Sequence, residues 1–334
     1  MNYIGSKSKL SSFIKETVYA TVGSDLSTKV FCDIFAGTGI VGRNFKAEVK
    51  TVIANDLEYY SYVLNQNYIA NSNVLTEATS YIETLNNLPL KKGFIYKNYC
   101  RKGGTDRNYF SAVNAQKIDA IRQQIALWKK TNTISDEMYY FLLTSLLESA
   151  DKVANTASVY GAYLKKLKKT AQKELQLMPA TFLLDNKKHQ VYNEDSNILI
   201  KKIKGDILYM DPPYNARQYG ANYHLLNTIA KYNEFVPKGK TGLPDYNKSD
   251  YCSKPKVKSS FEQLIKDANF KYIFLSYNNE GLMSVAEIKT IMSKYGKYSL
   301  AKTNYKRFRA DKAENRNHKA STTEEYLHIL IKNL

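Results

Sequence analysis

Four consecutive residues, Asp211, Pro212, Pro213 and Tyr214, carry groups that could activate a weak nucleophile. An exocyclic amine on a nucleobase is a poor nucleophile because its lone pair is delocalised into the ring. Two fixed acceptors for its N–H bonds would draw the nitrogen toward tetrahedral geometry, and the Asp211 carboxylate and the Pro212 carbonyl could supply them. The prolines stiffen this backbone, and the Tyr214 ring offers a face on which an extruded base can stack. A purely structural Asp-Pro-Pro turn with a core tyrosine is the alternative.

A glycine-rich loop with Gly37, Gly39 and Gly42 lies between a predicted strand and a predicted helix. Glycines there permit positive φ and let a ligand approach the backbone closely. Asp56 ends the next predicted strand, 19 residues after Gly37, where a carboxylate accepts ribose hydroxyls. The pattern indicates an adenosine-type cofactor, either a nicotinamide dinucleotide or S-adenosylmethionine, with a tight turn that binds nothing as the alternative. Asp33 favours S-adenosylmethionine because an acid there would repel a pyrophosphate, and a dehydrogenase does not need the group at 211–214.

Strands and helices that alternate along the chain must position these groups. Apolar runs typical of strands occur at residues 29–35, 51–56, 191–199, 206–210, 271–279 and 324–333. Their alternation with helical patterns predicts a mostly parallel sheet in an α/β fold. Residues 76–185 carry amphipathic helical spacing and predict a helical insertion, which leaves 1–75 and 186–334 for the sheet domain.

Three shorter stretches also have expected structures. Residues 162–175 are basic and predict a helix with a solvated lysine face. Residues 216–260 are rich in turn formers and lysine and predict irregular structure. The pattern from Ser284 predicts a helix that ends at Gly296.

The chain has a net charge of +18, which favours a polyanionic partner over lysines that serve only solubility. Its three cysteines are far apart, form no CxxC pair and do not cluster with histidines. This pattern predicts a reducing compartment, with neither disulfides nor a metal site. A signal-peptide core and a run of about 18 apolar residues are both absent. We therefore expect a cytoplasmic protein without a membrane partner.

Two basic stretches are candidates for the contact with nucleic acid. Residues 302–319 interleave cations with aromatic rings in a predicted loop or hairpin, a composition that suits phosphates and exposed bases. The expected contacts in this stretch are Lys306, Arg307 and Arg309. In residues 101–107, Arg101 and Arg107 flank two glycines and could read guanine. A solvated loop is the alternative at both places.

These motifs resemble the Dam-like, or alpha-group, adenine-N6 DNA methyltransferases, including methylases that accompany restriction enzymes. DPPY (211–214) matches the catalytic tetrad of that family, and DIFAGTG (33–39) is similar to its FxGxG loop. EDSN (194–197) resembles the motif that holds the adenine of the cofactor. YIGSKSKL (3–10) resembles the N-terminal motif of the family, with Ser6 where a second glycine is frequent.

The resemblance implies the residues of both sites. Those expected to bind S-adenosylmethionine are Tyr3, Ile4, Gly5, Ser6, Lys7, Asp33, Phe35, Gly37, Gly39, Asp56, Leu57, Asp195, Ser196 and Asp211. Those expected to be catalytic are Asp211, Pro212 and Tyr214. The implied fold is a Rossmann-like seven-stranded sheet of the class I S-adenosylmethionine-dependent methyltransferases, with an inserted helical target-recognition domain.

The implied reaction transfers a methyl group from S-adenosylmethionine to the N6 amine of a flipped adenine in a specific double-stranded DNA site. A cognate restriction enzyme is a candidate partner. The same chemistry on cytosine N4, on adenine in RNA or on a protein glutamine remains an alternative. A nucleic-acid-binding protein with a degenerate cofactor fold is an alternative of another class.

Overall fold

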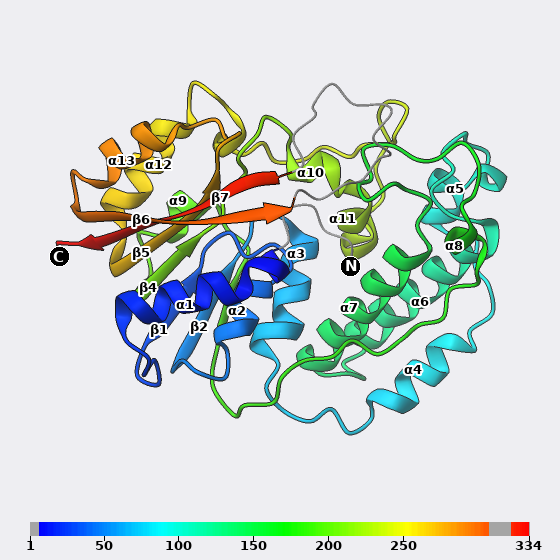
Figure 1. The fold of residues 1–334 in the computed structure, drawn as a ribbon. Helices are drawn as coiled ribbons and strands as arrows, with labels where there is room; N and C mark the ends of the chain where they lie inside the picture. The colour runs from blue at the N-terminus through cyan, green and yellow to red at the C-terminus, as the bar shows by residue number, and fades with distance from the viewer. Residues whose placement is uncertain (1–6, 307–321, 334) are drawn as a thin grey trace. The chain divides into compact units, whose positions relative to one another are not determined.

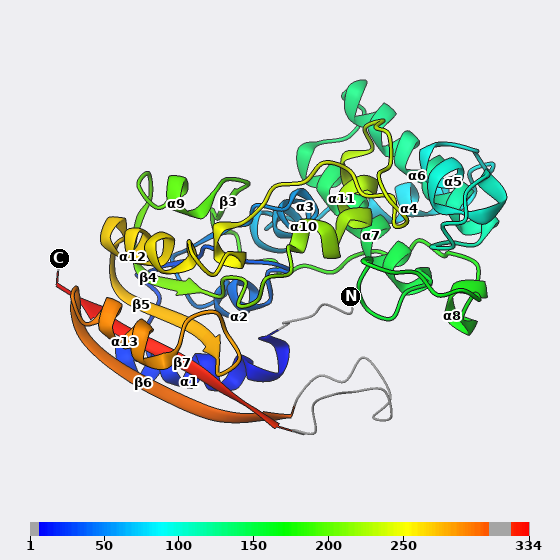
Figure 2. The same ribbon diagram turned by 90° about the horizontal axis from the view of Figure 1, so that it is seen from above.

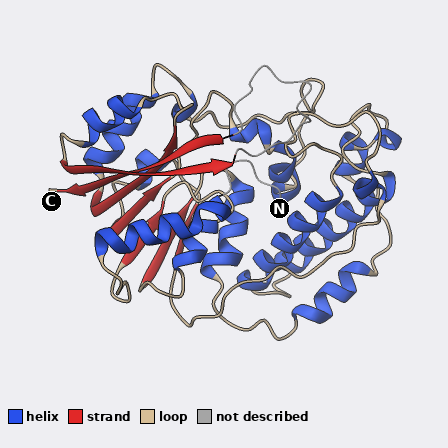
Figure 3. Ribbon diagram, in the orientation of Figure 1, coloured by secondary structure: helices blue, strands red, loops and turns tan. Residues whose placement is uncertain are grey.

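The computed structural model describes residues 7–306 and 322–333, which divide into two compact units. The sheet unit, as we name it, contains the described parts of Gly5–Asn65, Asp185–Gln218 and Asn247–Leu334. The helical unit contains Gln66–Leu184 and Tyr219–Tyr246. Every strand formed by the described residues lies in the sheet unit, as the red arrows of Figure 3 show.

The sheet has seven strands in the order β3-β2-β1-β4-β5-β7-β6. They are β1 (Val30–Asp33), β2 (Thr51–Asn55), β3 (Gln190–Tyr192), β4 (Lys204–Met210), β5 (Asn269–Asn278), β6 (Gly296–Lys306) and β7 (Thr322–Lys332). Strands β3, β2, β1, β4 and β5 pair in parallel, whereas β7 is antiparallel to both of its neighbours, β5 and β6. Figure 2 shows these last three strands side by side at one end of the sheet. The predicted Rossmann-like, mostly parallel fold is confirmed.

Helices cover both faces of the sheet (Figure 1). Side chains alternate across a strand, so Leu208 packs with Phe261 in a buried cluster under two helices, whereas Phe31 of the opposite face stacks on Phe45 with ring centroids 4.4 Å apart. Burial of both faces explains why the strands are almost continuously apolar. The helices of this unit are η1 (Lys7–Leu10), α1 (Ser11–Val22), α2 (Ile40–Phe45), α3 (Tyr59–Asn65), α9 (Ser196–Leu199), η4 (Asp250–Cys252), α12 (Val257–Asp267) and α13 (Val285–Met292).

The order of the strands places a topological switch between β1 and β4. From β1 the chain builds β2 and β3 on one side, and it then returns to build β4 and β5 on the other. In such sheets ligands bind outside the carboxyl ends of the strands at the switch. Asp33 ends β1, Asp56 follows β2 and Asp211 follows β4, so three acidic residues lie at this edge of the sheet.

The helical unit consists of η2 (Gln66–Ala70), α4 (Ala78–Asn86), α5 (Phe94–Tyr99), η3 (Arg101–Gly103), α6 (Ala112–Lys130), α7 (Asp136–Val153), α8 (Lys169–Gln172), α10 (Tyr219–Asn222) and α11 (His224–Lys231). Serine side chains at 111 and 135 cap α6 and α7, and both helices bury an apolar stripe. Buried Asp119 accepts backbone N–H bonds from Gly93, Ile95 and Tyr96 at 2.8–2.9 Å and so fixes the start of α5. None of the helices within the described residues is both long and apolar enough to cross a membrane.

Local structure differs from the sequence prediction in five places. Residues 296–306 form β6, where no strand was predicted. The strand predicted at 191–199 ends at Tyr192, because the Asp195 side chain caps α9 instead. The helix predicted at 162–175 is reduced to α8, since side-chain amides of Asn108 and Asn155 bind backbone carbonyls of the preceding loop. The stretch 216–260 contains helices, among them α11, whose apolar side chains are buried. Helix α13 ends at Met292, before Gly296.

Candidate active site

The glycine-rich loop after β1 packs tightly on helix α3. Gly37 and Gly39 have φ values of +52° and +74°, a region that other residues enter only at a cost. The Gly37 carbonyl accepts hydrogen bonds from the Ser61 hydroxyl and, at 3.1 Å, from the Asn65 amide. A Cβ added to Gly39 would lie 2.5 Å from Oδ1 of Asn65. The loop therefore needs glycine both for its backbone angles and for this close approach.

Asp56 joins the end of β2 to the same loop. Its Oδ2 accepts from the Gly37 N–H at 2.8 Å and its Oδ1 accepts from the Glu58 N–H at 2.9 Å. Burial raises the pKa of Asp56, and these backbone hydrogen bonds oppose the rise. Because each carboxylate oxygen accepts more than one hydrogen bond, Asp56 still has capacity for a ribose hydroxyl.

Asp33 is an almost completely buried acid with an unsatisfied oxygen. It is 1% exposed, and Oδ2 accepts from the Gly42 N–H at 3.3 Å. Oδ1 has no hydrogen-bond partner among the described residues. Burial, and then repulsion by Asp211, raise the pKa of Asp33 to about 8. A cation bound against Oδ1 would stabilise the ionised carboxylate.

The segment after β3 is tied to the end of β2. Asn193 donates from its amide to the carbonyls of Asp56 and Leu57 at 2.7 and 3.0 Å. Asp195 caps α9 through Oδ1, which accepts from the Asn197 N–H at 2.8 Å, and Ser196 is buried. The Tyr251 hydroxyl donates to Oδ1 of Asn197 in α9 at 2.9 Å. The Phe35 ring packs edge-to-face on Tyr251 with ring centroids 4.9 Å apart. These contacts hold the predicted adenine-binding residues on ordered backbone.

Asp211 pairs with a buried lysine from the N-terminal motif. Lys7 Nζ lies 3.1 Å from Asp211 Oδ1 and 3.9 Å from Glu325 Oε2, and the Lys7 side chain is only 5% exposed. Burial alone would lower the pKa of Lys7, but attraction to both carboxylates outweighs it and the pKa is raised. Burial raises the pKa of Asp211, and Lys7 opposes this rise. The ion pair with Lys7 thus engages Oδ1 of this carboxylate.

The rest of the tetrad is anchored to the core. Pro212 is buried and Tyr214 is half-buried. The Tyr214 carbonyl accepts from the Leu282 N–H at 3.0 Å, and its ring packs partly against the hydrophobic cluster of β4, β5 and α12. The ring is thus held in place, with part of its surface left exposed.

Comparison with known proteins shows the family to which the chain belongs. Residues 3–291 match the D12 class N6 adenine-specific DNA methyltransferases. The chain belongs to this family. This adenine methyltransferase is 62% identical over 332 residues to the Type II methyltransferase M.NlaIII of Neisseria lactamica, with 99% of each chain covered. It is 41% identical to the Type II methyltransferase M.CviAII of Paramecium bursaria Chlorella virus 1, with 93% of each chain covered.

A third relative is longer than this methyltransferase. The Type II methyltransferase M.FokI of Planomicrobium okeanokoites is 38% identical over 349 residues, which cover 100% of this chain and 53% of that protein. The predicted activity, methyl transfer from S-adenosylmethionine to adenine N6 in DNA, is confirmed by the family. The alternatives on cytosine, RNA or protein, and the non-catalytic alternative, are therefore set aside.

Some predicted site residues of the methyltransferase lie outside the described part of the chain. These are Tyr3, Ile4, Gly5 and Ser6, the side chain of Lys306, and Arg307 and Arg309. Arg101 is exposed on η3. The Arg107 guanidinium instead donates to the carbonyls of Asn98 at 3.3 Å and Gly239 at 3.1 Å. A guanine-reading role for Arg107 would require these internal bonds to open.

Four residues that the sequence analysis missed contact the residues of this candidate site. Ser61 and Asn65 hold the glycine-rich loop, and their spacing of one helical turn on α3 was the available signal. Asn55 binds the Ile34 and Glu194 carbonyls through its amide, each at 3.1 Å, and thereby joins the ends of three strands. Its position directly before Asp56 could have indicated this. Glu325 had no local signal, because only the pairing of β7 with β5 brings it to this edge.

Proposed function

We propose that Asp211, Pro212 and Tyr214 of this adenine DNA methyltransferase activate the N6 amine at the carboxyl edge of the sheet. The observation that carries the proposal is the placement of Asp211 directly after β4, with buried Lys7 3.1 Å from its Oδ1. This leaves Oδ2 of Asp211 as an acceptor for one N–H bond of the amine. The Pro212 carbonyl is the second acceptor, stiffened by two consecutive prolines.

The residues at the switch of the sheet fit S-adenosylmethionine, because buried Asp33 presents an oxygen without a partner to a site that would take a cationic ligand. Asp33 and the loop at Gly37 and Gly39 would hold the amino acid moiety, and Asp56 the ribose. Phe35, Leu57, Asp195 and Ser196 would border the adenine, and Lys7 would complete the pocket through Asp211. When bound, the cofactor supplies an electrophilic methyl group.

Side chains of this protein stabilise the developing charge and position the adenine. The negative charge of Asp211 stabilises the positive charge that develops on N6 as the amine attacks. The exposed part of the Tyr214 ring offers a stacking surface for the flipped adenine. Lys7 favours the ionised form of Asp211 against the effect of burial on its pKa, and it limits the rotation of the carboxylate. The acceptor then needs little reorganisation during the reaction.

We infer further that the protein modifies one specific double-stranded DNA site alongside a restriction enzyme. The support is its likeness to M.NlaIII and M.CviAII, which are both Type II methyltransferases. We also infer that the helical unit carries the target-recognition surface, since it lies outside the sheet that forms the site and includes exposed Arg101.

Long-read sequencing of DNA from a host that expresses the protein tests these proposals. We expect N6-methyladenine at a single sequence motif with the wild type and none with Asp211→Asn. Purified Asp211→Asn should still unfold cooperatively, which separates lost chemistry from lost structure. Persistent methylation by Asp211→Asn would refute the catalytic role, and methylation without a common motif would refute site specificity.

A further inference from the structure

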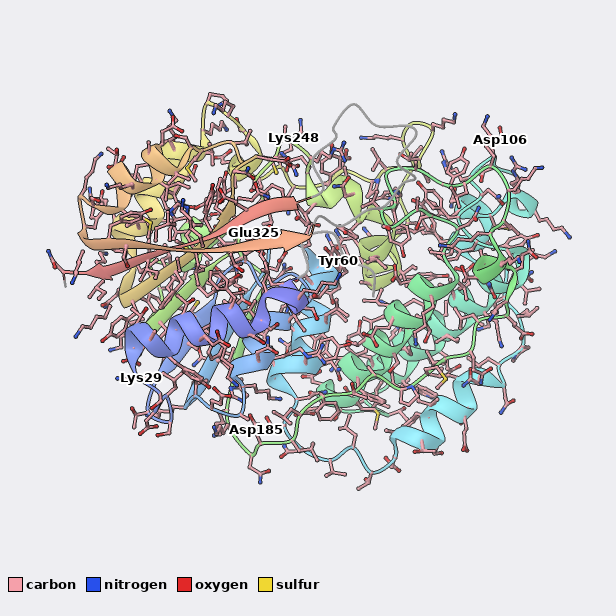
Figure 4. All side chains as sticks on the ribbon, in the orientation of Figure 1. Lys29, Tyr60, Asp106, Asp185, Lys248 and Glu325 are labelled. Atoms are coloured by element: carbon pink, nitrogen blue, oxygen red, sulfur yellow. The ribbon has the colours of Figure 1, made fainter. Side chains whose placement is uncertain are left out.

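Glu325 is a buried acid that the activation of the amine does not itself require. It lies on β7 opposite Asn278 of β5, and Figure 4 labels it on that strand. Its side chain is 11% exposed, and Oε2 has no hydrogen-bond partner among the described residues. Burying a carboxylate without compensation is costly, so a nearby charge should account for it.

The nearby charge is the Lys7 ammonium, which Glu325 shares with Asp211. Nζ of Lys7 is 3.1 Å from Asp211 Oδ1, within hydrogen-bonding distance, but 3.9 Å from Glu325 Oε2. The second contact is thus an ion pair that attracts the ammonium without a hydrogen bond. Lys7 is held between two carboxylates, and only one of them has a proposed role in the reaction.

An ammonium carries three donors on a flexible stem. With Asp211 as its sole partner, Lys7 could move to bridge both carboxylate oxygens and compete with the substrate amine for Oδ2. Attraction from Glu325 on another strand restrains such movement. The restraint also favours the charged form of Lys7, whose pKa is raised by Asp211 and Glu325 against the effect of burial.

We propose that Glu325 is a positioning residue for adenine methylation, which keeps the Lys7 ammonium on Oδ1 of Asp211 and leaves Oδ2 to the substrate amine. This inference rests on the proposed role of Asp211. Glu325 itself touches neither substrate nor cofactor in this scheme. Its removal should therefore change turnover and the pH dependence of turnover, and leave affinities unchanged.

The pH dependence follows from the protonation of the two acids beside Lys7, Glu325 and Asp211. Burial and the charge of Asp211 raise the pKa of Glu325, while Lys7 lowers it. Burial also raises the pKa of Asp211, and its closer, hydrogen-bonded contact with Lys7 opposes this rise. In the wild type, protonation of Glu325 should thus contribute to the fall of kcat toward low pH, which we call the acid limb.

The test compares kcat, KM and pH profiles of Glu325→Gln, Lys7→Gln and Asp211→Asn with those of the wild type. For Glu325→Gln we expect kcat to fall on the order of tenfold, as for a misplaced catalytic group. Its KM values for DNA and S-adenosylmethionine should stay within about twofold, because no contact with either is lost. Its acid limb should move to lower pH, since only Asp211 then titrates. Lys7→Gln, if it folds, should move the limb the opposite way.

Glu324→Gln is the matched control. Glu324 directly precedes Glu325 on β7, is exposed, and its Oε2 accepts a hydrogen bond from the Tyr326 hydroxyl at 2.7 Å. It should behave as wild type. A wild-type kcat and acid limb in Glu325→Gln would overturn the inference, and so would a loss confined to cofactor affinity. If Asp211→Asn also retains activity, the proposed function fails as a whole. If Asp211→Asn is inactive while Glu325→Gln is unaffected, only the role of Glu325 fails.

Discussion

The backbone N–H of Gly37 donates a hydrogen bond to Oδ2 of Asp56 at 2.8 Å. The carboxylate that follows β2 therefore holds the glycine-rich loop that follows β1, and the two predicted cofactor-binding elements form one structure. A change at either residue should affect the other.

Replacing Asp56 tests this coupling. Asp56→Ala should weaken S-adenosylmethionine binding by about 1–3 kcal/mol, because the ribose loses a charged acceptor and the loop loses a hydrogen bond. Isothermal titration calorimetry measures the loss. Asp56→Asn, which keeps one acceptor oxygen, should fall between Asp56→Ala and the wild type. An unchanged affinity for Asp56→Ala would contradict the ribose role.

Gly39→Ala should destabilise the loop more than an alanine at another glycine of positive φ. The left-handed backbone costs about 1–2 kcal/mol, and the new Cβ would also lie 2.5 Å from Oδ1 of Asn65. Gly104 is the control, because its φ is +100° and no atom lies within 4 Å of an added Cβ. Thermal unfolding of both variants compares the costs. If both variants lose the same stability, the Asn65 side chain moves away from the new Cβ at no cost in free energy.

The stability of the ligand-free protein should depend on pH through Asp33. Its pKa rises from 3.8 to about 8 in the folded state. The unfolded chain thus loses this proton at lower pH than the folded one, and the folded state loses stability as the pH rises from about 4 through 8. Asp33→Asn should lack this decline. Urea unfolding of both proteins from about pH 5 to about pH 9, a range that covers most of this decline, measures the difference. If the free energy of unfolding varies with pH in the same way in both proteins, Asp33 is not a buried neutral acid.

The same acid should release a proton when a cationic ligand binds. A positive charge beside Oδ1 lowers the pKa of Asp33, so S-adenosylmethionine binding near neutral pH should liberate part of one proton. Calorimetry in buffers of different ionisation enthalpy detects it. The buffer dependence should vanish in Asp33→Asn. A wild-type binding enthalpy that does not vary with the buffer would place the cation elsewhere.

Tyr214 should act through its ring. Tyr214→Phe should keep most activity, whereas Tyr214→Ala should lose at least about tenfold in turnover, because stacking is worth roughly 1–3 kcal/mol per base. Affinity for S-adenosylmethionine should change much less. Because the ring also packs against the core, thermal unfolding must accompany the kinetics. Wild-type turnover by Tyr214→Ala at saturating DNA and cofactor would leave the ring a packing role alone.

The basic stretch that contains Lys306, Arg307 and Arg309 should contact phosphates. Alanine at all three should weaken DNA binding and reduce the log–log salt slope by about 0.9 per lost contact. Arg101→Ala, in the helical unit, should instead change affinity for the target site more than for unrelated DNA. Fluorescence anisotropy over a range of salt concentrations separates the two effects. A lower affinity with an unchanged salt slope in the triple variant would exclude phosphate contacts.

The sequence by itself determined the chemical groups of the site and the local backbone structure that carries them. The glycines at 37 and 39, Asp56 and the tetrad at 211–214 each follow a strand, and the backbone requirements of a tight turn or of two consecutive prolines are local. The alternation of strands and helices likewise predicted the parallel sheet. These features could be read from spacing because they depend on residues close together in the chain.

Only the tertiary structure decided which distant groups meet. Lys7 and Glu325 are far apart in the sequence, yet Lys7 lies between the carboxylates of Asp211 and Glu325. The antiparallel pairing of β7 with β5 brings Glu325 to this edge of the sheet. Arg107, which could have read a base by its type and spacing, binds internal carbonyls, and a stretch that predicts irregular structure contains the buried helix α11. The physical reason is that strand order and burial follow from packing over the whole domain, whereas propensity and spacing describe only neighbours in sequence.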